Sequence, residues 1–316
     1  MNVLIWHVHG SYMTALVRGP HRWLIPVLPD RGPDGRGRAR TWDWPASAVE
    51  LAPEDLATED VDLVVLQRPE DEGLANAWLG GRRVGRDVPA VWLEHNAPQG
   101  RIAELRHPAA DRDDVTVVHV TPTNALFWDT GTTATRVIEH GVVDPGERYE
   151  GDLPRAAVAI NEPLRRGRVT GTDLLAGFAG TVPIDLFGMQ VDRVDVPGVH
   201  AHGEVTQQEL HGELSRRRVY LHPVRWTSLG LTLVEAMLLG MPVVALATLE
   251  VPDAVPPEAG VVSNHPDVLA AALRRFVDDP EAARLAGKAA RAAALERYGL
   301  ERFLADWNAV IAEVAR

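Results

Sequence analysis

Two features of residues 222–247 could do chemistry together. Residues 229–232 open an expected helix at Gly230, and the first N–H groups of a helix have no partner within it. Such N–H groups, at the positive end of the helix dipole, suit a phosphate. Glu235 lies about one turn inside the helix, so its carboxylate could accept hydrogen bonds from two hydroxyls of a sugar or ribose. An ordinary αβ unit with a surface glutamate is the alternative interpretation.

Apolar periodicity predicts the elements that would hold these residues. A broad apolar face at helical spacing follows Thr232, Gly240 ends the helix, and the run at 243–247 is typical of a buried parallel strand. Further apolar runs, alternating with helical segments, predict strands at 2–8, 63–67, 90–96, 115–120, 156–160, 184–188 and 260–262. The sequence therefore predicts an α/β protein with parallel sheets.

This stretch resembles the signature of retaining GT-B glycosyltransferases of the large glycogen-synthase-like group (family 4, group 1 type). The matching positions are His222-Pro223, Gly230-Leu231, Glu235-Ala236-Met237, Gly240 and Pro242-Val243-Val244. A second match, residues 135–149, resembles the Val-Ile-x-x-Gly-Val-Asp segment that carries the family's chain out of its first domain. One departure is Thr227, which stands where the family has the first Glu of a Glu-x7-Glu pair.

The resemblance implies a GT-B fold, with two Rossmann-like domains facing across a cleft. Residues 1–150 would form the acceptor domain and residues 151–299 the nucleotide-sugar-binding domain. Residues 300–316 would cross back onto the first domain as a helix. The apolar stripe expected on that helix comprises Leu300, Phe303, Leu304, Trp307 and Ile311.

The same resemblance implies roles for individual residues. Glu235 would hold the ribose, and Arg165, with the N–H groups of the 230–232 segment, would hold the diphosphate. His95, at the end of a predicted strand, would contact the donor sugar, so His95 and Arg165 are the implied catalytic residues. The other implied donor-site residues are Thr227, Ser228, Leu229, Gly230, Leu231, Thr232, Thr170, Gly171 and Val205. The implied acceptor-side residues are His9, Gly10 and Ser11.

A second departure concerns the charge near the diphosphate. Thr170 stands where relatives have a Lys, and Arg165 lies five residues earlier, at the spacing of the family's Arg. Arg166 and Arg168 could supply the missing charge, because guanidinium groups bind phosphate through two parallel hydrogen bonds. A solvated basic turn is the alternative.

Other polar positions leave alternatives open. Gln67 and its neighbours end a predicted strand and could contact an acceptor or serve only structure. Trp42 and Trp44, in a Gly- and Pro-rich loop, could stack on a sugar ring, although packing against the sheet is the commoner outcome. The two Asp-x-Asp sequences, at 60–62 and 111–113, precede strands instead of following them. We therefore predict no metal site and no cofactor.

Composition excludes several classes of protein. The chain has 316 residues, long enough for two domains, and 46% of them are hydrophobic. A net charge of −12 argues against nucleic acid as a partner, and the absence of cysteine excludes disulfides and thiolate chemistry. We see no secretion signal and no apolar run long enough to span a membrane, so we expect a cytoplasmic protein. The sequence does not predict an oligomeric state.

The expected function is transfer of a sugar from a nucleotide sugar to an acceptor hydroxyl, with retention of configuration and without a metal. Two alternatives remain open. One is a nucleotide-sugar 2-epimerase, an enzyme class on the same fold. The other is a non-catalytic nucleotide-sugar-binding protein, suggested by Thr170 and Thr227 at positions where the family has Lys and Glu.

Overall fold

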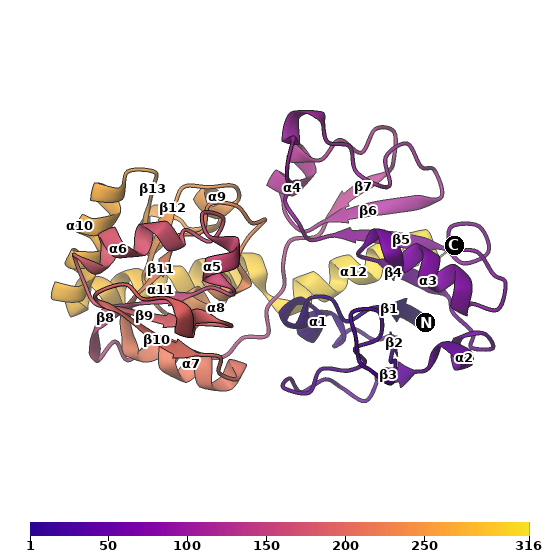
Figure 1. The fold of residues 1–316 in the computed structure, drawn as a ribbon, viewed down its shortest axis with the longest axis horizontal. Coiled ribbons are helices and arrows are strands. Elements are labelled where there is room, and N and C mark those ends of the chain that lie inside the picture. The colour runs from indigo at the N-terminus through magenta and orange to yellow at the C-terminus, as the bar shows by residue number, and fades with distance from the viewer. Residues whose placement is uncertain (316) are drawn as a thin grey trace. The chain divides into compact units, whose positions relative to one another are not determined.

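A computed structural model describes residues 1–315 and divides the chain into two compact units (Figure 1). The first unit contains Met1–Val143 and the residues from Leu300 onward, and the second contains Asp144–Gly299. Each unit holds one sheet in which every pairing between strands is parallel. The α/β class predicted from the sequence is therefore confirmed.

The sheet of the first unit has the strand order β3-β2-β1-β4-β5-β6-β7. Its strands are β1 (Asn2–Ile5), β2 (Arg22–Pro26), β3 (Ala48–Leu51), β4 (Leu63–Leu66), β5 (Ala90–Glu94), β6 (Val115–His119) and β7 (Thr135–Val137). The order of the chain reverses between β1 and β4. In doubly wound sheets, ligands bind beyond the carboxyl ends of the strands at such a reversal.

Helices cover both faces of this sheet. They are α1 (Gly10–Leu16), α2 (Pro53–Leu56), α3 (Pro69–Trp78), α4 (Pro122–Phe127) and α12 (Leu300–Val314), with a 3-10 turn η1 (Ile102–Glu104). Leu4, Trp6 and Val64 share one core with side chains of α2 and α3. The last helix, α12, packs against α1, where the Trp307 indole donates a hydrogen bond to the Tyr12 hydroxyl at 2.9 Å.

The sheet of the second unit has the order β10-β9-β8-β11-β12-β13, with its reversal between β8 and β11. Its strands are β8 (Leu153–Ala159), β9 (Ile184–Phe187), β10 (Val199–Gly203), β11 (Arg217–His222), β12 (Val243–Leu246) and β13 (Gly260–Ser263). Both sheets therefore share one winding scheme, which places a reversal beside the first strand of each unit.

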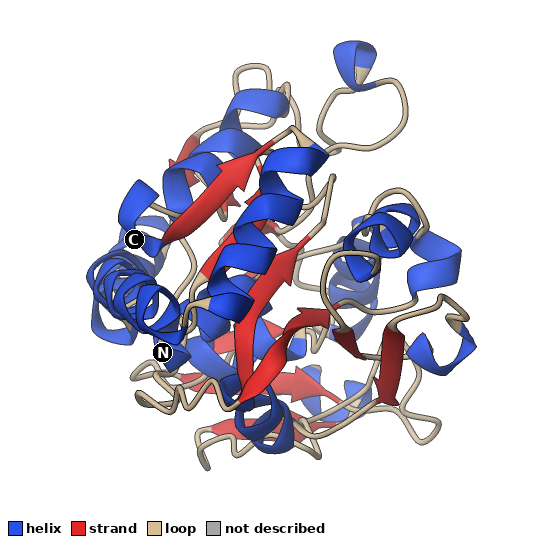
Figure 2. Cartoon of the chain, turned by 90° about the vertical axis from the view of Figure 1, so that its left-hand side faces the viewer, coloured by secondary structure: helices blue, strands red, loops and turns tan. Residues whose placement is uncertain are grey.

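The helices of the second unit also form two layers around its sheet (Figure 2). They are α5 (Pro163–Arg166), α6 (Leu175–Ala179), α7 (Gln207–Arg216), α8 (Leu231–Leu239), α9 (Val251–Ala254), α10 (Pro266–Asp278) and α11 (Pro280–Tyr298). The 3-10 turns are η2 (Thr172–Leu174), η3 (Val191–Arg193) and η4 (Pro257–Ala259). Val219 and Leu221 of β11 share a core with α6 and α10, and the alternation of side chains turns Tyr220 and His222 to the opposite face.

The division between the units falls after Val143, whereas the sequence places the domain boundary at residue 150. Contacts of the 144–151 segment explain the difference. Arg148 and Tyr149 donate their backbone N–H groups to the Leu239 carbonyl, and the Asp144 carboxylate pairs with Arg291 at 2.8 Å. This segment is therefore tied to the second unit before its first strand begins.

No helix within residues 1–315 combines the length and apolar character needed to cross a bilayer.

The contact between α8 and α11 leads to a stability prediction. A Cβ added at Gly287 would lie 1.9 Å from the Gly240 carbonyl oxygen, so α11 approaches the end of α8 too closely for any side chain. We expect Gly287→Ala to lower the free energy of unfolding by about 1–3 kcal/mol, as overpacking does. Thermal melting measures the effect.

Gly177→Ala is the matched control. Gly177 lies within α6, and an added Cβ would meet nothing within 4 Å. The same substitution there should be neutral or stabilising by up to ~1 kcal/mol, because alanine loses less backbone entropy on folding. Equal melting temperatures for the two variants would contradict the packing argument.

Candidate functional site

The loops that follow β8 and β11 pack directly on each other. Gly171 has φ +73°, and an added Cβ would lie 1.9 Å from the Pro223 carbonyl oxygen. The Arg225 and Trp226 N–H groups both donate to the Val169 carbonyl, at 2.9 and 3.2 Å. The structure therefore brings Thr170 and Gly171, far apart in sequence from the 222–232 segment, into contact with its first residues.

The backbone at position 230 lies so close to the His222 ring that only glycine fits there. Gly230 precedes α8, and an added Cβ would lie 2.7 Å from Cε1 of His222, at the end of β11. Burial lowers the pKa of His222 to about 4, so its ring is neutral at physiological pH. No side chain caps the start of α8, and its first turn contains no acidic residue. The first backbone N–H groups of α8, which are predicted to meet a phosphate, are therefore not capped by a side chain.

Glu235 is buried, with 3% of its surface exposed. The Gln207 amide donates to Oε1 of Glu235 at 2.8 Å, and Nε2 of His211 lies 3.4 Å from Oε2. Both partners come from α7, which begins directly after Val205 and Thr206. The predicted ribose carboxylate thus accepts a hydrogen bond from Gln207 and lies close to His211, and the sequence analysis missed both residues. Their spacing of four residues, which places both on one face of a helix, was the feature of the sequence that could have indicated them.

The arginines of the loop after β8 differ in their surroundings. Arg165, two-thirds exposed, forms an ion pair with Glu162, and Arg168, also exposed, pairs with Asp173 at 3.1 Å. Arg166 is half-buried, and burial, followed by repulsion from Arg165, lowers the pKa of its guanidinium. Among residues 1–315, no carboxylate lies within ion-pair distance of Arg166. The structure therefore singles out Arg166 as the partly desolvated cation of this loop.

The remaining predicted donor-site residues differ in burial. Thr170 is buried, and its hydroxyl contacts the Gly167 carbonyl at 3.1 Å and the Thr172 hydroxyl at 2.9 Å. The residue that stands where the family has a Lys is therefore buried inside the loop. Ser228 and Leu229 are buried, whereas Thr227, Leu231 and Thr232 are partly exposed.

In the first unit, the predicted residues at the ends of β1 and β5 come together. The rings of His9 and His95 lie 4.2 Å apart between centroids, and Tyr12 meets His95 edge-on at 4.6 Å. Nε2 of His95 lies 2.9 Å from Oε1 of Gln67, at the end of β4. Burial, with repulsion from His9 and His140, holds the pKa of His95 well below its usual value. This cluster offers neutral rings and hydrogen-bonding groups.

The loop over residues 29–45 covers the turn after β1. Trp42 lies over Gly10, where an added Cβ would be 2.3 Å from its indole ring. Trp44 is buried, and its indole donates to the Thr14 hydroxyl at 2.9 Å. Trp44 therefore packs inside the unit, whereas the partly exposed Trp42 lies beside Gly10, one of the predicted acceptor-side residues.

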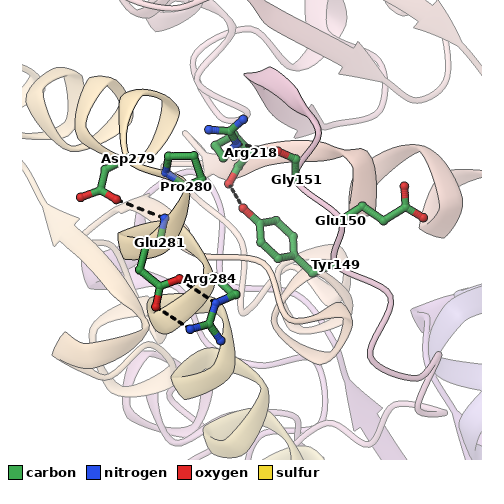
Figure 3. A pocket seen from close by; sticks show the side chains of 8 residues that line it. All are labelled: Tyr149, Glu150, Gly151, Arg218, Asp279, Pro280, Glu281 and Arg284. Atoms are coloured by element: carbon green, nitrogen blue, oxygen red, sulfur yellow. Dashed lines mark hydrogen bonds and ion pairs between the residues drawn. The ribbon is translucent and has the colours of Figure 1, made fainter.

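A cavity of about 390 Å³ lies elsewhere in the second unit (Figure 3). Its lining residues are Tyr149, Glu150, Gly151, Arg218, Asp279, Pro280, Glu281 and Arg284. Arg218 belongs to the beginning of β11, whereas His222 ends that strand, so the cavity adjoins the opposite end of the sheet from the candidate site. Its polar groups largely pair with each other: Glu281 binds Arg284, and the Tyr149 hydroxyl donates to the Arg218 carbonyl.

Within the described residues, no group of three or more His, Cys, Asp or Glu is arranged to hold a metal ion.

Together these features define a class of protein. Two parallel sheets of Rossmann type each carry polar residues beyond the strand ends at the reversal of strand order. In the second unit, a glycine precedes a helix N-terminus that no side chain caps, and a carboxylate lies one turn inside that helix, an arrangement that suits a phosphate and a hydroxyl-bearing ligand. This combination is the organisation of a GT-B protein.

Comparison with known proteins identifies the family of one region. The model of the family glycosyl transferases group 1 matches residues 196–293, so this region is a glycosyl transferases group 1 domain and the predicted family is confirmed there. By sequence, no curated protein matches significantly.

Three solved structures illustrate the likeness in fold. Sucrose-phosphate synthase from Thermosynechococcus elongatus aligns with a TM-score of 0.73 and 16% identity, covering 99% of this chain and 98% of that one. Anabaena HepE in complex with UDP aligns with a TM-score of 0.67 and 14% identity, covering 99% of this chain and 100% of that one. Staphylococcus aureus TarM aligns at 0.62 and 15%, covering 79% of this chain and 55% of that one. These likenesses confirm the predicted GT-B fold.

Two histidines of the first unit, the buried His140 and the half-buried His9, predict acid sensitivity. Burial lowers the pKa of His140 to about 3 and that of His9 to about 4, below the ordinary value of 6.5. As pH falls below 6.5, these histidines become protonated in the unfolded chain but stay neutral in the folded unit. The free energy of unfolding present at neutral pH is therefore lost towards pH 4. Each such histidine contributes a slope of about 1.4 kcal/mol per pH unit.

His140→Phe removes one of these groups while keeping a ring in the same space. We expect urea unfolding between pH 7 and pH 5 to show a shallower loss of stability in this variant. His265→Asn, at an exposed position, is the matched control and should keep the wild-type slope. An unchanged slope in His140→Phe would show that His140 does not resist protonation.

Proposed function

We propose that this protein transfers a sugar from a nucleotide sugar to an acceptor hydroxyl, with retention and without a metal ion. The observation that carries the proposal is the geometry around Gly230. Close packing against His222 leaves the start of α8 without a side-chain cap, and Glu235 lies one turn further on. Structures of HepE are complexes of that protein with UDP and with UDP-glucose, which supports the same ligand class here.

In the second unit, the donor would be held through the ribose and the diphosphate of its nucleotide part. The ribose hydroxyls would donate to Glu235 and replace the Gln207 amide, which occupies Oε1 in the structure. The diphosphate would accept hydrogen bonds from the first N–H groups of α8. Arg166 would add the positive charge, since a desolvated guanidinium without a carboxylate partner gains most from an anion. Arg165 would first have to leave Glu162.

The residues of the first unit would act on the sugar and the acceptor. His95, held neutral by burial, would exchange a hydrogen bond with a donor-sugar hydroxyl. In the reaction, the bond from the anomeric carbon to the phosphate oxygen breaks and a bond to the acceptor oxygen forms. The leaving phosphate takes the acceptor proton, so no dedicated base is required.

Turnover of nucleotide sugars tests this function directly. The protein is incubated with a panel of nucleotide sugars and simple acceptors, with and without a chelator, and the product configuration is read by NMR. A retained glycoside formed in the presence of chelator is the expected result. Release of an epimerised free sugar would indicate the epimerase. Binding without turnover would indicate a non-catalytic nucleotide-sugar-binding protein.

Glu235→Gln tests the ribose contact. We expect the affinity for a nucleoside diphosphate to fall by about 1.5–3 kcal/mol, the worth of hydrogen bonds to a charged group. Calorimetric titration measures it, with thermal melting beside it because Glu235 is buried. Glu258→Gln, at an exposed position of the same unit, is the control and should bind as the wild type does. Unchanged affinity in a folded Glu235→Gln protein would exclude the ribose role.

Arg166→Ala tests the diphosphate contact. The variant should lose about tenfold or more in affinity for a nucleoside diphosphate, because charge-assisted hydrogen bonds are worth about 1.5–3 kcal/mol. Affinity for the nucleoside should change little. Arg168→Ala, an exposed neighbour in the same loop, is the control. A larger loss in Arg165→Ala than in Arg166→Ala would assign the role to Arg165 instead.

A further inference from the structure

Gln67 occupies a central position among three adjacent strand ends. The strand order places β4 between β1 and β5. Trp6 directly follows β1, Gln67 follows β4, and His95 follows β5. The Gln67 side chain is nearly buried, and it contacts both neighbours.

The orientation of the Gln67 amide is fixed by its surroundings. Its Nε2 lies 2.7 Å from the Trp6 carbonyl oxygen, which can only accept, so this atom must be the NH₂ group. The Gln67 and Arg68 backbone N–H groups both donate to one carboxylate oxygen of the buried Asp71, at 2.9 and 3.0 Å. The backbone and the amide nitrogen are therefore both held, and the amide oxygen Oε1 is left facing His95.

That oxygen dictates where the His95 ring carries its proton. Nε2 of His95 lies 2.9 Å from Oε1 of Gln67, and an amide oxygen has no hydrogen to give. If Nε2 were unprotonated, two lone pairs would face each other at this distance. Nε2 therefore carries the hydrogen and donates it.

We propose that Gln67 is a positioning residue that fixes His95 in its neutral form protonated on Nε2, with Nδ1 as the accepting nitrogen. The Trp6 carbonyl fixes the orientation of the Gln67 amide, and the amide oxygen fixes which nitrogen of the His95 ring carries the hydrogen. The functional consequence rests on the proposed glycosyl transfer: a donor-sugar hydroxyl that meets Nδ1 must donate its hydrogen to it. His95 then selects for a sugar hydroxyl and cannot serve as a proton donor through that nitrogen.

The ring surroundings reinforce the neutral state. The His9 ring lies tilted beside His95, with 4.2 Å between the ring centroids, and Tyr12 meets both His95 and His140 edge-on. With the charged form disfavoured, the choice between the two neutral forms is left to hydrogen bonding. Gln67 contributes to that choice through its contact with Nε2 of His95.

Nitrogen-15 NMR of the histidine rings in the ligand-free protein tests the proposal without any activity. In the wild type, long-range proton–nitrogen correlations should give His95 the pattern of a ring protonated on Nε2. Gln67→Met keeps the length of the side chain and removes the accepting oxygen, so the form protonated on Nδ1 should become populated. Gln99→Met, in an exposed loop of the same unit, is the matched control and should leave the pattern unchanged.

Gln67→Glu provides a second variant if Gln67→Met does not fold. A carboxylate still accepts from Nε2 of His95 but favours the doubly protonated ring, so the His95 titration should move to higher pH. A wild-type ring protonated on Nδ1, or a Gln67→Glu titration identical to that of the wild type, would overturn the proposal.

Kinetics separate this proposal from the proposed function. With the true donor, Gln67→Met should lower kcat/KM by about tenfold, the worth of one hydrogen bond, and Gln67→Glu should shift the pH profile. If the wild type turns over no nucleotide sugar while its His95 is protonated on Nε2, the glycosyl-transfer function fails and the positioning by Gln67 stands. If turnover occurs and Nδ1 is protonated, the positioning fails alone.

Discussion

The close contact between Gly171 and the Pro223 carbonyl is the constraint on which the candidate site of the second unit depends. Since β8 and β11 are neighbours at the reversal of strand order, the loops that leave them compete for the same space. A side chain at Gly171 would displace the 223–226 backbone, which leads directly to the start of α8. Gly230 relieves the same crowding against His222. Two missing side chains therefore position the helix end that a phosphate would meet.

The two units use different electrostatics at corresponding places. At the strand ends of the first unit, burial keeps His9, His95 and His140 neutral, so a ligand there would meet hydrogen-bonding groups without charge. The second unit instead presents Glu235 and the half-buried Arg166, which suit a ribose and an anion. A nucleotide sugar has this same division, with a charged nucleotide part and an uncharged sugar.

Segments connected to edge strands contact residues of both candidate sites. The loop between β2 and β3 places Trp42 over Gly10, and α7, which follows β10, holds Glu235 through Gln207. Edge strands leave room for long or variable connections, because one side of the strand has no neighbour. The parallel core thus sets where ligands can bind, and the connections at its edges determine which groups reach them.

The sequence by itself determined the α/β class, the strands with continuous apolar runs and the helix that opens near Gly230, because these depend on local periodicity and on glycine. It missed the edge strands β3, β7 and β10, whose residues are mostly half-buried or exposed and lack an apolar run. It also missed the interior strands β2 and β11. Only the tertiary structure decided the pairing of Glu235 with Gln207, the burial of Arg166 and the contact of Gln67 with His95. These pairs join side chains from different elements, and their distances follow from how the elements pack, which no spacing along the chain records.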